Sequence, residues 1–173
     1  MRSIRLTLLL LATLLISPSE PAQAQDMSGA IRTQASKAGK GVASWYSARG
    51  NQPVWSGEYL GALAQFLQSL DAHGLSPNLF RFQEWDAKWR NPSPDPTQRA
   101  AVEVGTTQLA LYAIQSLAYG FVDPTSVHPK WSPIPRQVNS YQFLDKALQQ
   151  GPGGFTAYLL QEAAPKDPRY PEM

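Results

Sequence analysis

Proline and glycine limit what this chain can fold into more than any other feature of its sequence. Its 173 residues include 15 prolines and 12 glycines. Proline interrupts helices and central strands because it has no backbone N–H, and glycine favours turns and helix ends. The ordered segments are therefore expected to be short and sharply bounded. A length of this order also favours a single domain.

The clearest segment lies between Ser56 and Gly74. Ser56 is a typical N-cap residue, and Trp55 before it is placed to form a hydrophobic staple with Leu60. Gly74 followed by Leu75 has the composition of a Schellman stop. The apolar residues between these ends recur at intervals of three and four, as on one helix face: Tyr59, Leu60, Leu63, Phe66, Leu67 and Leu70. The pattern predicts a helix that ends at Gly74.

The longest predicted helix runs from Asp95 to Tyr119. Asp95 suits the N-cap, Pro96 suits the first helical position, and Gln98 suits the third, where it would complete a capping box. Gly120 follows as a stop of the same kind as the glycine that ends the earlier helix. The buried face is expected to include Val102, Leu109, Ala113 and Leu117.

Weaker patterns complete the expected fold. They are a helix-compatible stretch over 28–48, a stripe of Phe82, Trp85 and Trp89 on a short helix, a helix from N-cap Asn139 to Gln150 with Gln142 at its third position, a turn over 151–154, and a last helix to Ala163. Residues 123–135 hold four prolines and are expected to be irregular. We find no alternating strand pattern and no fixed-period repeat. The sequence therefore predicts an all-α fold, a compact multi-helix domain with proline-rich connecting loops.

The first residues have the features of an export signal. Arg2 and Arg5 precede an apolar run, and Ala22 and Ala24 place small residues where a signal peptidase cleaves. The run is shorter than the roughly 20 residues that cross a bilayer, so we expect cleavage after Ala24 and no stable membrane span afterwards. This interpretation gives a signal peptide over 1–24, a weakly helical N-terminal extension over 25–41 and a helical domain over 42–170. The expected location is the bacterial periplasm.

The composition excludes several classes of function. The chain has no cysteine, so it has no thiol nucleophile, disulfide, thiolate zinc site or iron–sulfur cluster. Its formal net charge is only +2 and it has no dense basic run, which argues against nucleic acid as a partner. His73 is expected in the last turn of a helix, where it suits the helix dipole. His128 has no second ligand nearby in sequence, so no metal or cofactor is expected.

Carboxylates and aromatic residues are the remaining candidates for chemistry or binding. Glycoside hydrolysis needs two carboxyl groups flanking a cleft, and no spacing pairs those available, which are Glu58, Glu84, Asp86, Glu103 and Glu162. The serines Ser47, Ser56 and Ser132 lack the glycines of a nucleophile elbow. The aromatic candidates for contact with a glycan or a partner are Trp45, Tyr46, Trp55, Tyr119 and Trp131, because such rings stack on sugars. Core and staple roles are the alternative explanation for most of them.

Several pieces of the sequence, taken in order, resemble a known family. They are Trp45-Tyr46 with 50–55 (GNQPVW), 72–77 (AHGLSP), and 117–124 (LAYGFVDP) with Trp131. Together they are similar to the N-terminal scaffold domain of the large YcbB-type L,D-transpeptidases, over roughly residues 42–170. The chain departs from that family at Phe121, where a basic residue is usual, and at Thr107-Gln108, where an acidic residue is usual.

The resemblance implies a role in cell-wall assembly. In that family the helical scaffold precedes a peptidoglycan-binding module and a catalytic domain, whose cysteine nucleophile follows a Ser-His-Gly motif and cross-links murein. This sequence has neither the cysteine nor the motif, so the resemblance is expected to cover the scaffold alone. It implies a non-catalytic module whose partner is a periplasmic transpeptidase or peptidoglycan. The alternative is a wall-active hydrolase that uses paired carboxylates, and convergence of those side chains in one pocket would distinguish it.

The export signal gives a direct prediction. We expect the mature protein recovered from the periplasm to begin at Gln25, because cleavage follows the small residues at 22 and 24. N-terminal sequencing of the purified protein measures this. Recovery of a chain that begins at Met1 from the soluble cytoplasm would contradict the expected location.

Overall fold

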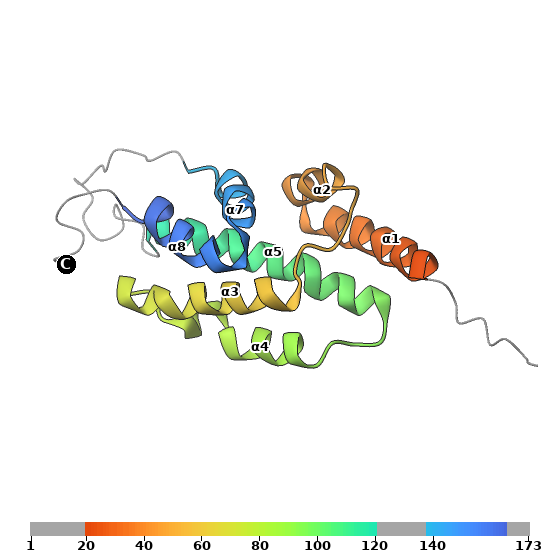
Figure 1. Ribbon diagram of the computed structural model, residues 1–173, viewed down its shortest axis with the longest axis horizontal. Coiled ribbons are helices and arrows are strands. Elements are labelled where there is room, and N and C mark those ends of the chain that lie inside the picture. Colours follow the sequence, from red (N-terminus) through yellow and green to blue (C-terminus); the bar gives the residue numbers. More distant parts are fainter. Residues whose placement is uncertain (1–19, 121–137, 166–173) are drawn as a thin grey trace, which may run out of the picture.

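The computed structural model describes the backbone of residues 20–120 and 138–165 (Figure 1). Every regular element in these ranges is helical, which confirms the predicted all-α class. The α-helices are α1 (Glu20–Ala38), α2 (Lys40–Ser47), α3 (Gly57–Ser69), α4 (Phe82–Arg90), α5 (Pro96–Tyr119), α7 (Ser140–Gln149) and α8 (Gly151–Ala163). Two short 3-10 helices, η1 (Leu70–His73) and η2 (Pro77–Phe80), connect α3 to α4.

Helix α5 is the centre of the domain. In Figure 1, α1 and α2 lie over its first half and α7 and α8 over its second, while α3 packs against α8. Its buried residues run from Ala100 to Ala118 on most of its circumference. Burial of the predicted Leu109, Ala113 and Leu117 is confirmed, whereas Val102 is only half-buried.

Residues 25–41, which the sequence sets apart as an extension, lie mainly in α1. This helix packs along α5 and encloses Ile31 and Ala35 completely. These two residues are one turn apart, so the buried face of α1 is narrow, and its sequence is only weakly amphipathic for that reason. At Gly39 the chain takes a φ of 118°, which separates α1 from α2, so the helix-compatible stretch over 28–48 is divided between two helices.

The predicted N-caps are confirmed. In each, a side-chain oxygen accepts a backbone N–H of the first turn: Ser56 from Tyr59 at 3.5 Å, Asp95 from Thr97 at 2.9 Å, and Asn139 from Gln142 at 3.2 Å. The N–H bonded to Asp95 belongs to Thr97, rather than to Gln98 as a capping box would require. These caps satisfy donors that have no partner inside the helix.

The two predicted glycine stops differ: α3 ends at Ser69 and the chain continues as η1, which Gly74 closes, whereas Gly120 follows α5 directly. Gly74 takes the left-handed conformation with φ 73° and ψ 13°, and the Leu75 N–H donates to the Leu70 carbonyl at 3.0 Å. This confirms the Schellman stop. Gly120 also has a positive φ, 79°, but its ψ is 178°, so the same kind of stop is wrong there. That region of backbone space is accessible essentially to glycine alone.

The glycine-rich run over 151–154 is the first turn of α8, not a turn that precedes it. Gly151 has a φ of 72°, which lets the chain reverse direction directly after α7. Pro152 is tolerated because the first turn of a helix needs no N–H from that position. The expected irregular segment over 123–135 lies outside the described residues.

Within the part of the chain that the structure describes, none of the helices combines the length and the hydrophobicity needed to cross a membrane.

Two glycines of neighbouring segments provide a matched test of this fold. Gly74→Ala should lower the free energy of unfolding by roughly 1 kcal/mol or more, because a Cβ disfavours the left-handed conformation. Gly61→Ala, on the exposed side of α3 with open space around it, should instead raise it by roughly 0.5–1 kcal/mol. Urea unfolding followed by circular dichroism measures both. Equal effects of the two substitutions would mean that the helix does not end as described.

Candidate functional site

The main polar site of the described residues is buried between α2, α5 and the segment before α3. Glu103 and Thr107 lie one turn apart on α5. The Tyr46 hydroxyl of α2 donates to Glu103 Oε1 at 3.0 Å and lies 2.7 Å from Thr107 Oγ1. The Val54 N–H donates to the same carboxylate oxygen at 2.6 Å, and Trp55 Nε1–H donates to Thr107 Oγ1 at 2.9 Å.

These bonds form one chain with a consistent direction. Trp55 donates to Thr107, whose hydroxyl can donate to Tyr46, whose hydroxyl donates to Glu103. Each hydroxyl thus uses its single proton once. Because the chain ends on a carboxylate, it is most strongly polarised when Glu103 is ionised.

Burial sets the protonation of this site. It raises the pKa of the Glu103 carboxyl, and the bonds from the Val54 N–H and from Tyr46 offset part of that rise. Burial, together with the nearby Glu103, also raises the pKa of the Tyr46 hydroxyl. Since the folded state holds the Glu103 proton more tightly than the unfolded state, this group lowers stability as pH rises from the ordinary carboxyl pKa to the raised one.

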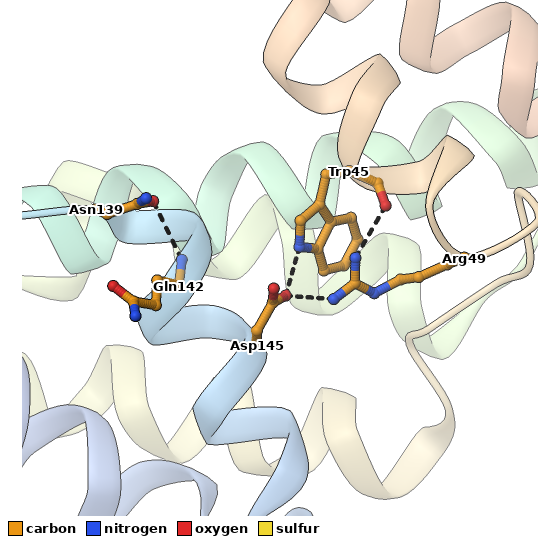
Figure 2. Close-up of polar contacts among 5 residues, drawn as sticks. All are labelled: Trp45, Arg49, Asn139, Gln142 and Asp145. Atoms are coloured by element: carbon orange, nitrogen blue, oxygen red, sulfur yellow. Dashed lines mark hydrogen bonds and ion pairs between the residues drawn. The ribbon is translucent and has the colours of Figure 1, made fainter.

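A second, partly exposed cluster joins α2 to α7 (Figure 2). Trp45 Nε1–H donates to Asp145 Oδ1 at 2.6 Å, and the Arg49 guanidinium pairs with the same oxygen. Arg49 also donates to the Trp45 carbonyl at 2.9 Å, and its guanidinium carbon lies 3.9 Å from the centre of the Trp45 ring. The same two helices approach closely at Gly41, where a Cβ would lie 2.5 Å from the Tyr141 hydroxyl and would make that side chain shift.

The aromatic candidates do not form one exposed surface in the described part of the chain. Trp45, Tyr46 and Trp55 are all buried, so most of the surface of each ring is packed inside the domain. Tyr119 is 49 % exposed, and its hydroxyl accepts the Val138 N–H at 2.7 Å. Trp131 lies outside the described residues. The polar edges of the three buried residues serve internal hydrogen bonds, which favours the core alternative for them, and contact with a glycan or a partner stays a prediction.

The candidate carboxylates do not come together in the described part of the chain. Glu84 pairs with Arg81 and Asp86 pairs with Arg90, on the exposed side of α4. Glu103 is buried alone among neutral donors, and Glu58 and Glu162 belong to α3 and α8. Among the residues that the structure describes, the hollow that Glu103 lines contains no second carboxylate. The paired-carboxylate hypothesis thus receives no support from the geometry.

The histidine and serine candidates have local roles where they are described. His73 closes η1, as expected for a helix end, and Ser56 is the N-cap of α3. Ser47 is the last residue of α2. His128 and Ser132 lie outside the described residues. Over 20–120 and 138–165, no group of three or more His, Asp or Glu side chains is placed to hold a metal ion.

A small hollow adjoins the buried site. It has a volume of about 190 Å³ and is lined by residues of α1, α3, α4 and α5 and of the loops before α3 and after α4. Trp55, Leu60, Trp89 and Val102 give it apolar walls, and Glu103 also lines it. Lys88 and Arg99 also line it, and both are exposed.

Comparison with known families identifies the chain. A family model described as a scaffold domain matches residues 40–173. The chain belongs to the scaffold domain family. The matched range starts at Lys40, the first residue of α2. Helix α1 packs on α5 but lies before the matched range. No curated protein and no solved structure matches the sequence.

Sequence reasoning missed several residues that organise this scaffold domain. The sequence suggests Glu103 only as a catalytic acid, whereas in the structure it is the one acidic residue of α5 and is buried, as acidic residues rarely are unless they are paired. Thr107, where the resembled family usually has an acidic residue, supplies a hydroxyl that serves both Tyr46 and Trp55. Arg49 and Asp145 are 96 positions apart, and no local pattern connects them.

The hydrogen-bond chain predicts the effect of one substitution of similar size. Thr107→Val should lower the free energy of unfolding by about 1–3 kcal/mol, because the buried Trp55 Nε1–H loses its acceptor. The same change in a Trp55→Phe background should cost less, since that donor is already absent. Chemical unfolding of the four proteins measures the coupling, and Thr97→Val on the exposed first turn of α5 is the control. Additive effects would contradict the bond from Trp55 to Thr107.

Proposed function

We propose that this scaffold domain is a non-catalytic, exported interaction module that acts by contact in peptidoglycan cross-linking. It works in the periplasm, on a transpeptidase or on murein itself. The observation that carries the proposal is membership of the scaffold domain family over residues 40–173. The resemblance of its sequence pieces to the scaffold of the large L,D-transpeptidases supports the link to the cell wall.

The use of its polar residues supports a role in binding. The Glu103 carboxylate and the edges of Tyr46 and Trp55 serve bonds that hold the helices together. Acids on α4 pair with arginines of the same segment. A glycosidase would instead place two carboxyl groups on either side of a cleft. Because these polar groups bond one another, the proposed role depends on binding through the surface of the domain.

The test combines binding with turnover. Purified protein beginning at Gln25 should sediment with murein sacculi or co-elute with a periplasmic L,D-transpeptidase, through an interface of at least about 1,000 Å² for a stable complex. It should release and cross-link no muropeptides. A helical periplasmic protein of similar size and net charge is the background control.

Two results would contradict the proposal. One is failure to bind both sacculi and transpeptidases in protein whose circular dichroism shows it to be folded. The other is turnover of murein. If turnover disappeared in Glu103→Gln or Glu84→Gln while the helical spectrum remained, the carboxylate hydrolase would be the correct interpretation.

A further inference from the structure

The hollow beside the buried site has the size of a single side chain. Pockets for small-molecule ligands have volumes of about 300–1,000 Å³, whereas this hollow has about 190 Å³. Pockets that receive one buried side chain of a partner are the usual position of the strongest contacts in protein interfaces. Its dimensions thus favour an anchoring residue over a small-molecule ligand.

Its two tryptophans are held in place before any partner arrives. Trp89 Nε1–H donates to Thr106 Oγ1 at 3.0 Å, and Trp55 Nε1–H donates to Thr107 Oγ1 at 2.9 Å. Both indole donors are therefore used, and the rings offer hydrocarbon to the hollow. Walls fixed in this way reduce the entropy lost on binding.

The rim of the hollow is positively charged. Lys88 on α4 and Arg99 on α5 are exposed, and neither forms an ion pair within the described residues. The Lys88 ammonium lies 4.4 Å from the centre of the Trp85 ring, near Glu84, whose carboxylate is paired with Arg81. Glu103 is buried and accepts bonds from Val54 and Tyr46. An apolar floor with cations at its edge complements an apolar group that carries a carboxylate beside it.

We propose that this hollow is an anchor site for a partner protein segment in which an acidic side chain flanks a bulky apolar one. The apolar side chain enters between Trp55 and Trp89, and the neighbouring carboxylate lies against Arg99 and Lys88. This inference rests on the proposed function, because it gives the interaction module a specific contact point.

The experiment uses the protein beginning at Gln25 and two acetylated, amidated dipeptides, Asp-Phe and Asn-Phe. Indole N–H resonances are followed by NMR and assigned with Trp55→Phe and Trp89→Phe variants. We expect saturable shifts of the Trp55 and Trp89 signals but not of Trp45. The Asp peptide should bind about threefold to tenfold tighter than the Asn peptide, as two partly exposed ion pairs allow.

Matched variants separate charge from shape. Arg99→Ala and Lys88→Ala should each reduce the preference for Asp over Asn, and the double variant should abolish it. Lys40→Ala removes the same charge at an exposed position that does not line the hollow, and should keep the preference. Val102→Phe should fill the hollow and abolish binding of both peptides, with circular dichroism confirming that the variant folds.

Several results would overturn the inference. They are the absence of saturable shifts, equal binding of the two peptides, and a preference that survives the double variant. Saturation by a murein tetrapeptide in place of Asp-Phe would make the cell wall the occupant, and self-association abolished by Arg99→Ala would make it a second copy. Retention by sacculi or a transpeptidase that is unchanged in the double variant would leave the proposed function intact while excluding this site.

Discussion

The hydrogen-bonded chain that ends on Glu103 is the interaction on which most of this domain depends. A buried carboxyl group is costly unless it is bonded, and here its partners come from two other segments, the Tyr46 hydroxyl of α2 and the Val54 N–H before α3. Both segments are thereby positioned against α5 by one buried oxygen atom. Apolar contacts alone would allow either of them to slide along α5, since hydrophobic attraction has no direction.

The same constraint explains why aromatic residues that suit a sugar are found in the interior. Tyrosine and tryptophan have an apolar face and one polar edge. They can therefore either stack on a sugar or lie in the core with the polar edge hydrogen-bonded. In this domain the edges of Tyr46 and Trp55 meet Thr107, and the edge of Trp45 meets Asp145. Residue type therefore could not distinguish the two roles, and only the packing of α2 and of the segment before α3 against α5 and α7 does so.

Local features of the fold were predictable from sequence, and long-range ones were not. Ser56, Asp95, Asn139 and Gly74 act within one turn of their own position, so the signal and the effect lie in the same few residues. The break at Gly39 escaped prediction because a lone glycine is also tolerated inside helices. The bond from Tyr46 to Glu103 spans 57 positions and that from Trp45 to Asp145 spans 100, and no periodicity extends over such distances. The hollow is assembled in the same way from residues of four helices and two loops, so no single segment contains a motif for it.

The buried network and the hollow share residues, and this links stability to binding. Thr106 and Thr107 are adjacent on α5, and successive residues of a helix point about 100° apart. One threonine therefore bonds Trp89 on α4 while the other bonds Trp55 on the opposite wall. Trp55 belongs at once to the hollow and to the segment whose backbone bonds Glu103. Any group that packs against Trp55 in the folded state must also stabilise that segment on α5, because a ligand that binds only the native arrangement shifts the equilibrium toward it. Because both tryptophan walls of the hollow are hydrogen-bonded to α5, less of their side-chain entropy is lost when a group binds between them.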